Sequence, residues 1–204
     1  MSETLSSTEI SELICTRISH DLIGNIGAVS NAVELLEEGD TDFMDDIRSI
    51  LNTSSTVLSA RLKFFRMAFG LNNSNLEKAD MIFSVSQDYL KTLGNANYPL
   101  ELKMKLSSAK FGRMAMLCLM IVADTMFRGG RIEVEEDGDA LAVVGFSEKA
   151  ASPEKVQAIK EALSGNVPDN PAQFAPVFYL QELLGDTKYK LYMVEQNSFG
   201  FIIK

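Results

Sequence analysis

The stretch Ser11–Glu38, SELICTRISHDLIGNIGAVSNAVELLEE, decides the organisation of the chain and contains its only histidine, His20. Apolar residues recur in it at steps of three and four, which is the period of an amphipathic helix packed on other helices. The residues of this seam are Ile18, Leu22, Ile26, Val29, Val33 and Leu36. His20 lies about 160–200° around the helix from Ile18 and Leu22, so we expect it to face away from the seam.

The helix face that carries His20 also carries two glycines, Gly24 and Gly27. Each glycine inside a helix costs about 1 kcal/mol relative to alanine. The expected compensation is room for another molecule to approach the histidine. The other residues that share this face are Leu13, Thr16, Arg17, Ile23 and Asn31.

Composition and charge limit the class of protein. The 204 residues suffice for one large domain or two small ones, and a hydrophobic content of 46 % excludes a disordered chain. The net charge of −9 and the lack of lysine or arginine runs argue against nucleic-acid binding. No apolar run is long enough to span a membrane, and the first residues lack the pattern of a signal peptide. We therefore expect a soluble, cytoplasmic protein that binds neither nucleic acid nor membrane.

Residues 1–72 are predicted to form an antiparallel helical hairpin. The first helix begins after Ser7 or Thr8 and ends near Gly39, and a second helix begins at Asp40 or Thr41 and ends at Gly70. Apolar residues also recur at helical spacing along the second helix, at Ile47, Leu51, Leu58, Leu62, Phe65 and Phe69. Two such long helices cannot cover their own apolar surface, so we expect the hairpin to form a four-helix bundle by dimerisation. The alternative left open is that the C-terminal half covers this surface within one chain.

Residues 73–204 alternate between helix and strand patterns and are predicted to form a second, α/β domain. Strands are expected at Tyr98–Leu106, Arg131–Glu136, Leu141–Phe146, Lys188–Glu195 and Phe199–Ile203, and helices at Leu76–Leu93, from Ser107 or Ser108 to Arg128, after Ser152, and from Asn170 to Leu184. The order predicts an α+β protein with an antiparallel or mixed sheet and helices on one face.

Few residues in the chain could carry chemistry. A single histidine excludes hydrolytic triads and histidine metal clusters, and no glycine-rich phosphate loop is present. The two cysteines, Cys15 and Cys118, fall in apolar helical patterns, so we expect both to be buried and unpaired. What remains is His20 with Asp21. An exposed imidazole is largely neutral near pH 7 and nucleophilic at a ring nitrogen, and the neighbouring carboxylate can orient the ring without blocking the free nitrogen.

The residues around His20 resemble a known family. The stretch Arg17–Ile23, RISHDLI, followed by GAVSNAVELL at residues 27–36, resembles the phosphoacceptor helix of two-component histidine kinases, and is most similar to ChpT-like histidine phosphotransferases of alphaproteobacteria. Ala60–Gly70, ARLKFFRMAFG, resembles the second helix of that family, and FRGG at residues 127–130 resembles its C-terminal half. The resemblance implies that residues 73–204 are an α/β sandwich related to the ATP-binding domain of histidine kinases, in degenerate form.

Two departures from the kinase pattern are informative. A histidine kinase holds Mg-ATP with asparagines in a helix that corresponds to residues 111–128, which contain none, and with an Asp-x-Gly-x-Gly loop, which the chain lacks. The resemblance therefore implies a phosphotransfer protein that does not bind ATP. The second departure is Asn25, where histidine kinases and their close relatives usually have proline, so the helix keeps one more backbone hydrogen bond there.

The resemblance implies a relay in which His20, flanked by Asp21, takes a phosphoryl group from the aspartate of one receiver domain and passes it to the aspartate of another. The receiver supplies Mg²⁺, so no cofactor or metal ligand is expected on this chain. The docking surface is expected to comprise Leu13, Arg17, Ile23, Gly24, Gly27 and Asn31, with Arg61, Lys63 and Arg66 of the second helix at the height of His20. These three cations either meet the acidic receiver or are ordinary solvated side chains. The alternative function is a non-catalytic module that binds receivers or kinases; an active ATPase is a weaker third possibility.

Overall fold

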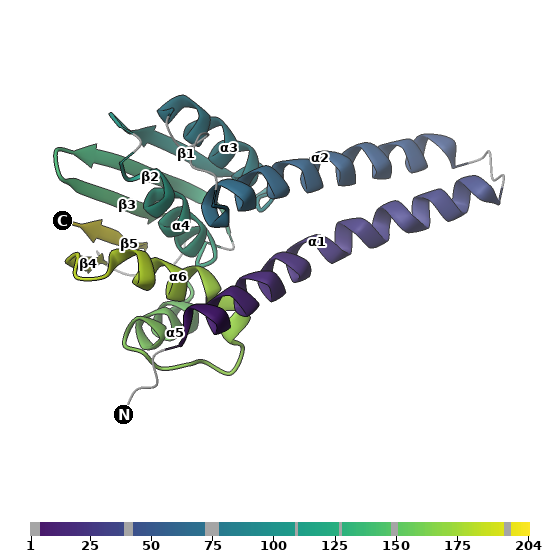
Figure 1. Ribbon diagram of the computed structural model, residues 1–204. Helices are drawn as coiled ribbons and strands as arrows, with labels where there is room; N and C mark the ends of the chain where they lie inside the picture. The colour runs from purple at the N-terminus through teal and green to yellow at the C-terminus, as the bar shows by residue number, and fades with distance from the viewer. Residues whose placement is uncertain are drawn as a thin grey trace.

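The computed structural model describes residues 5–38, 43–71, 78–108, 110–126, 128–147, 151–193 and 197–204. A long helical hairpin projects from a body of sheet and shorter helices (Figure 1). Helix α1 spans Ser7–Glu37 and helix α2 spans Met44–Phe69, and the two run side by side. The predicted hairpin is therefore present.

The hairpin's ends follow local signals. Helix α1 begins with a capping box, in which the Ser6 hydroxyl accepts from the Glu9 N–H and the Glu9 carboxylate accepts from the Ser6 N–H at 2.8 Å. The cap is thus one residue before the predicted Ser7. Helix α2 ends at Gly70 as predicted, where the Gly70 N–H donates to the carbonyl of Arg66 at 3.0 Å. The expected turn at Gly39 and Asp40 or Thr41 lies outside the described residues.

A five-stranded mixed sheet has the order β1-β2-β3-β5-β4. Its strands are β1 (Leu100–Lys105), β2 (Gly130–Asp137), β3 (Ala140–Phe146), β4 (Tyr189–Tyr192) and β5 (Ser198–Ile203). Strands β1 and β2 pair in parallel and the other neighbours are antiparallel, which confirms the predicted mixed sheet. The link into β2 requires glycine because Gly129 has a φ of 72°, and a Cβ there would lie 2.6 Å from the carbonyl oxygen of Pro99.

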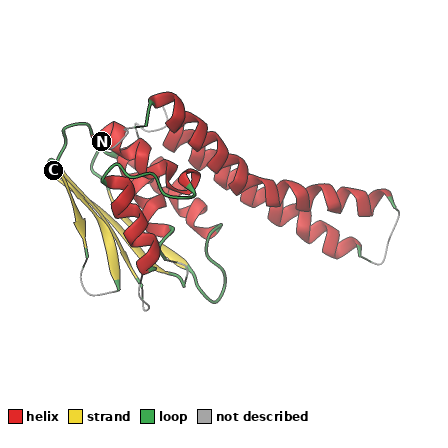
Figure 2. Ribbon diagram, turned by 90° about the horizontal axis from the view of Figure 1, so that it is seen from below, coloured by secondary structure: helices red, strands yellow, loops and turns green. Residues whose placement is uncertain are grey.

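Helices cover one face of the sheet and leave the other face open (Figure 2). They are α3 (Ala79–Lys91), α4 (Gly112–Ala123), α5 (Pro153–Leu163) and α6 (Ala175–Leu184), preceded by the 3₁₀ turn η2 (Pro171–Phe174). The mixed α+β architecture is the one expected. None of the helices described is long and apolar enough to cross a lipid bilayer.

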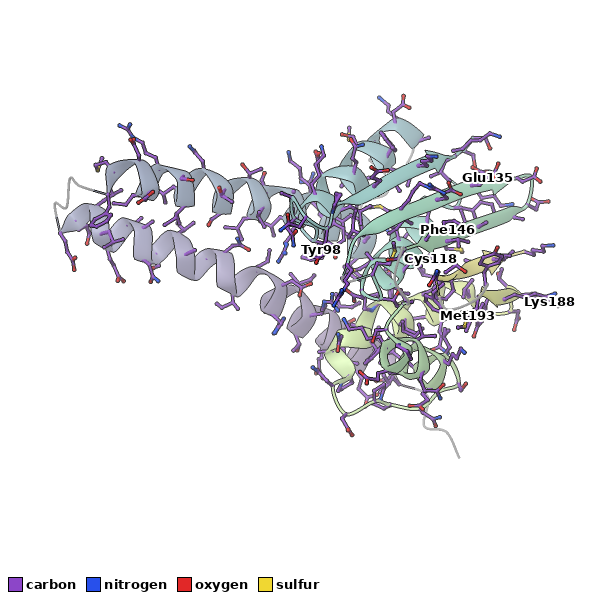
Figure 3. The ribbon with its side chains drawn as sticks, turned by 180° about the vertical axis from the view of Figure 1, so that it is seen from behind. Tyr98, Cys118, Glu135, Phe146, Lys188 and Met193 are labelled. Atoms are coloured by element: carbon purple, nitrogen blue, oxygen red, sulfur yellow. The ribbon has the colours of Figure 1, made fainter. Side chains whose placement is uncertain are left out.

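Helix α4 forms the centre of the body, with ten of its 12 residues buried. Cys118 lies on this helix inside the body, whereas Lys188 and Met193 lie at its edge (Figure 3). The predicted cap at Ser107 or Ser108 is wrong because α4 begins only at Gly112. Both serines instead donate backbone N–H groups to the carboxylate of Glu136 on β2, at 2.8 and 3.0 Å.

One hydrophobic cluster joins the base of the hairpin to the body. Ile10 and Leu22 of α1 and Phe64 and Phe65 of α2 belong to the same buried cluster as α4 and the inner face of the sheet. The body therefore covers the base of the hairpin within one chain. The alternative to dimerisation predicted such coverage for the entire apolar surface of the hairpin. The division at residues 72/73 stays a prediction, because residues 72–77 are outside the described ranges.

The far half of the hairpin keeps much of its apolar surface exposed. On the predicted seam Leu22 is buried, whereas Ile26 is 49 % exposed and Val33 is 42 % exposed. Other exposed apolar residues on the two helices are Ile23, Leu35, Leu36, Ile50 and Leu62. The prediction that both cysteines are buried is half right: Cys118 is buried but Cys15 is exposed on α1.

Candidate functional site

His20 lies on the outer face of α1, close to the junction between hairpin and body. Its side chain is 86 % exposed, which agrees with the predicted orientation away from the seam. Beside it is a cavity of about 330 Å³ between α1 and the turn η2 of the body. The residues that line this cavity are Thr16, Arg17, His20, Asp21, Asn170, Ala172 and Gln173.

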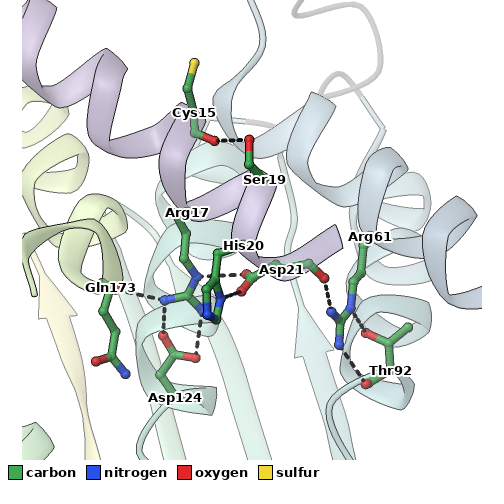
Figure 4. Close-up of polar contacts among 9 residues, drawn as sticks. All are labelled: Cys15, Arg17, Ser19, His20, Asp21, Arg61, Thr92, Asp124 and Gln173. Atoms are coloured by element: carbon green, nitrogen blue, oxygen red, sulfur yellow. Dashed lines mark hydrogen bonds and ion pairs between the residues drawn. The ribbon is translucent and has the colours of Figure 1, made fainter. Parts of the chain in front are cut away.

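Asp21 uses its two carboxylate oxygens differently. Oδ1 lies 3.5 Å from Nδ1 of His20, and Oδ2 accepts a hydrogen bond of 2.8 Å from Nε of Arg17 (Figure 4). The side chain is 18 % exposed. The carboxylate therefore flanks His20 at Nδ1 and leaves Nε2 open to solvent, the flanking geometry that the sequence predicted.

Arg17 is not on an exposed docking surface, contrary to the prediction. Its guanidinium donates to both oxygens of Asp124, from Nη1 at 3.0 Å and Nη2 at 3.1 Å, and to the carbonyl of Gln173 at 2.9 Å. Burial disfavours the charged form of Arg17, but the charges of Asp124 and Asp21 outweigh it and raise the arginine pKa above its ordinary value. The side chain is internal because the body packs against this flank of α1, which no helical periodicity could reveal.

Arg61 is also used within the chain. Its guanidinium donates to the backbone carbonyl of Asp21, and to the hydroxyl and carbonyl of Thr92 at 3.2 and 3.3 Å. The predicted height of Arg61 opposite His20 is therefore confirmed, but its donors hold α1, α2 and the end of α3 together. Lys63 and Arg66, the other two predicted cations, are exposed on α2.

The remaining predicted docking residues lie on α1 with different degrees of exposure. Ile23 is 63 % exposed, and a Cβ added at Gly24 or Gly27 would meet no atom within 4 Å. Asn31 is exposed further along the hairpin, whereas Leu13 is half-buried against the core. The space beside the two glycines is thus open, and whether a partner fills it stays a prediction.

Tyr89 on α3 lies beneath this site with its side chain fully buried. Among the described residues its hydroxyl has no hydrogen-bond partner. Burial, followed by the charge of Asp124, raises the pKa of this hydroxyl above its ordinary value, although Arg17 opposes that shift. We refer to Arg17, Asp21, Arg61, Tyr89 and Asp124 as the polar layer.

Sequence reasoning missed Asp124, Tyr89 and Gln173. The one available signal was that Asp124 directly follows a long apolar helix, where a carboxylate needs a partner to be tolerated. Within the described ranges, no group of three or more His, Cys, Asp or Glu side chains could hold a metal ion.

Comparisons with known proteins agree on one family. The family model for the histidine phosphotransferase C-terminal domain matches residues 80–196. The protein phosphotransferase ChpT of Brucella abortus (strain 2308) is 45 % identical over 71 residues, which are 35 % of this chain and 33 % of that protein. The chain thus matches about a third of the length of that curated relative.

Solved structures extend the likeness of fold to the whole chain. A bacterial phosphotransferase superposes with a TM-score of 0.76 and 24 % identity, covering 100 % of both chains. The blue-light activated histidine kinase of Erythrobacter litoralis EL346 aligns with 91 % of this chain and 62 % of its own, at 12 % identity. Its TM-score of 0.46 is too low to establish a shared fold.

Proposed function

This chain belongs to the histidine phosphotransferase family, and on that premise we propose that it relays a phosphoryl group between receiver-domain aspartates through His20, without using ATP. The observation that carries the proposal is the geometry of the single histidine. Its side chain is 86 % exposed and its Nδ1 faces the carboxylate of Asp21 at 3.5 Å, so we assign the nucleophilic role to the other ring nitrogen, Nε2.

The transfer step needs only one nucleophilic atom from this chain. The lone pair of Nε2 attacks the phosphorus of the receiver's aspartyl phosphate, the P–O bond to that aspartate breaks, and its electron pair remains on the released carboxylate. The proton on Nδ1 stays on the ring, where Asp21 balances the positive charge that develops. In the second step the carboxylate of another receiver attacks the same phosphorus, and the N–P electron pair returns to the ring.

The proposal that ATP takes no part is supported by residues 111–128 and by the packing of α4. These residues contain no asparagine, and the chain has no Asp-x-Gly-x-Gly loop. The side chains of α4 are occupied by core packing, with Met116, Leu117, Leu119 and Met120 fully buried. The protein would then be a degenerate relative of the kinase ATP-binding domain that acts as a phosphotransfer protein.

We assign the partner surface to the part of α1 that borders His20. It comprises the exposed side chain of Ile23, the open space at Gly24 and Gly27, and Asn31, with Leu13 at its edge and Lys63 and Arg66 on α2 nearby. The receiver would bring Mg²⁺ in its own acidic pocket. Arg17 and Arg61 are left out because their donors are already engaged within the chain.

The exposed far half of the hairpin supports a homodimer. Ile26 and Val33 of α1 and Ile50 of α2 are each at least 40 % exposed, and a second hairpin packed against them would form a four-helix bundle. We also propose a cytoplasmic location for the protein, as expected from the sequence.

Mixing the protein with a ³²P-labelled receiver, and separately with labelled ATP, tests the function. We expect label to move from the receiver to an acid-labile, base-stable adduct, and His20→Ala to abolish it. Cys15→Ser, an exposed position one turn along α1, is the matched control and should transfer normally. Label arriving from ATP would contradict the proposal. Receiver binding without any transfer would instead favour the non-catalytic binding module.

A further inference from the structure

An ion pair between the hairpin and the body lies close to His20. It joins Arg17 of α1 to Asp124 at the end of α4. Asp124 ends helix α4, where its N–H donates to the carbonyl of Met120 at 3.1 Å. Because α4 is almost entirely buried, the position of this carboxylate is fixed by the core of the body. Its partner Arg17 lies on α1, three residues before His20, so this pair links the central helix of the body to the helix turn that carries the histidine.

The guanidinium of Arg17 has little freedom to move. All three of its nitrogens donate: Nε to Asp21, Nη1 to Asp124 and Gln173, and Nη2 to Asp124. A planar guanidinium that makes this many bonds cannot rotate without losing several of them at once. The arginine therefore transmits the position of Asp124 to Oδ2 of Asp21.

Asp21 is held at both its side chain and its main chain. Arg17 fixes Oδ2, while Arg61 of α2 donates to the backbone carbonyl of the same residue. The oxygen that remains, Oδ1, is the one that faces Nδ1 of His20 at 3.5 Å. The series of contacts from Asp124 through Arg17 and Asp21 thus ends at Nδ1 of His20.

We propose that Asp124, acting through Arg17, is a positioning residue for His20. The body thereby orients Asp21 so that Nδ1 carries the ring proton and Nε2 is left as the nucleophile. This inference rests on the proposed phosphotransfer function and adds a role for the C-terminal half that requires no nucleotide. The competing explanation is that the Arg17–Asp124 pair only fastens the hairpin to the body.

Two variants separate these explanations. Asp124→Asn keeps an acceptor but removes the charge that holds Arg17. The double variant Arg17→Met with Asp124→Leu replaces the pair by apolar side chains of similar size, a change that buried ion pairs often tolerate without loss of folding. Ser7→Ala is the control, because it removes another contact between α1 and the body, to Glu182, more than three helical turns from His20.

Two measurements decide the outcome. In single-turnover transfer from a phosphorylated receiver, both variants should lower the maximal rate about tenfold while the receiver concentration at half-maximal rate stays unchanged. In long-range ¹H–¹⁵N spectra of the single histidine, the wild type should show the Nδ1–H tautomer and the double variant a mixture of tautomers. Ser7→Ala should match the wild type in both.

Three results would overturn the inference. The first is a folded double variant with wild-type rate and tautomer. The second is a loss of rate that arises only from weaker receiver binding, and the third is an equal loss in Ser7→Ala. If the wild type transfers no phosphate at all, the proposed function fails, and the tautomer comparison alone still decides whether Asp124 and Arg17 orient the ring.

Discussion

Arg17 and Asp124 are separated by 107 positions in the sequence and joined by two hydrogen bonds of 3.0 and 3.1 Å. The pair connects the helix that carries His20 to the central helix of the body, and its two members retain 10 % and 21 % of their side-chain exposure. Bidentate pairs of this kind are geometrically specific, so this contact adds a defined orientation to the hydrophobic packing that joins the hairpin to the body.

Breaking the pair at one end should destabilise the fold. Asp124→Ala leaves the buried charge of Arg17 without its main partner, and we expect the free energy of unfolding to fall by about 3 kcal/mol. Urea denaturation followed by circular dichroism measures the change. The double variant Arg17→Met with Asp124→Leu should lose far less free energy of unfolding. An equal loss in both variants would show that the change in side-chain volume, and not the unpaired charge, causes the destabilisation.

Gly27→Ala should separate stability from function. Because a Cβ at this position meets no atom within 4 Å, alanine should stabilise the helix by about 0.5–1 kcal/mol. If receivers approach across this face, the same change should slow transfer about tenfold. Ser11→Ala, on the opposite face of α1, is the control for helix propensity. A Gly27→Ala protein with normal transfer would remove this glycine from the docking surface.

Tyr89→Phe should leave the protein at least as stable as the wild type. The buried hydroxyl has no partner among the described residues, so its removal relieves a desolvation cost of about 1 kcal/mol. Thermal and urea unfolding measure the effect. Tyr179→Phe is the comparison, since the Tyr179 hydroxyl accepts from Arg113 at 3.4 Å; there we expect a small loss. A marked loss in Tyr89→Phe would mean that its hydroxyl is satisfied in solution.

Glu136 should make stability depend on pH. The Ser108 hydroxyl, and then the N–H groups of Ser108 and Ser107, donate to its carboxylate and hold its pKa below the ordinary value, although burial opposes this. A pKa that is lower in the folded state stabilises the protein above the unfolded-state pKa, and this stabilisation is lost as the pH falls through the folded-state pKa. Glu136→Gln should therefore be less stable than the wild type at pH 7. The difference between their free energies of unfolding, measured by urea denaturation, should become smaller below about pH 4. A stability difference that does not change with pH would contradict this role of the Glu136 carboxylate.

Val33→Glu should dissociate the proposed dimer. Val33 is 42 % exposed on the far half of the hairpin, and a carboxylate placed in a four-helix bundle would be buried without a partner. Light scattering should give twice the 22.5 kDa chain mass for the wild type and the single mass for the variant. Lys190→Glu, on the edge strand β4, should remain dimeric. A wild-type protein of single mass would exclude the bundle.

Local patterns predicted most of the elements because their causes are local. The apolar period placed α1 and the exposed side of His20, the glycine at residue 70 ended α2, and Ser152 with Pro153 began α5. The same reasoning failed at Ser108, whose backbone and hydroxyl donate to Glu136 across the body instead of capping a helix. A cap and a tertiary acceptor satisfy the same donors, and the sequence does not distinguish them.

The sequence by itself determined the position of the single histidine on α1, the carboxylate beside it and the lack of a kinase nucleotide motif, since each depends on residue identity and helical spacing. Only the tertiary structure decided the fate of Arg17. It lies about 60° from His20 on α1, so periodicity placed it on the docking face, whereas the body covers that flank and supplies Asp124 as its partner. A contact between residues so distant in the chain leaves no trace in any local pattern, because it arises from the packing of α4 and not from the helix that carries the arginine.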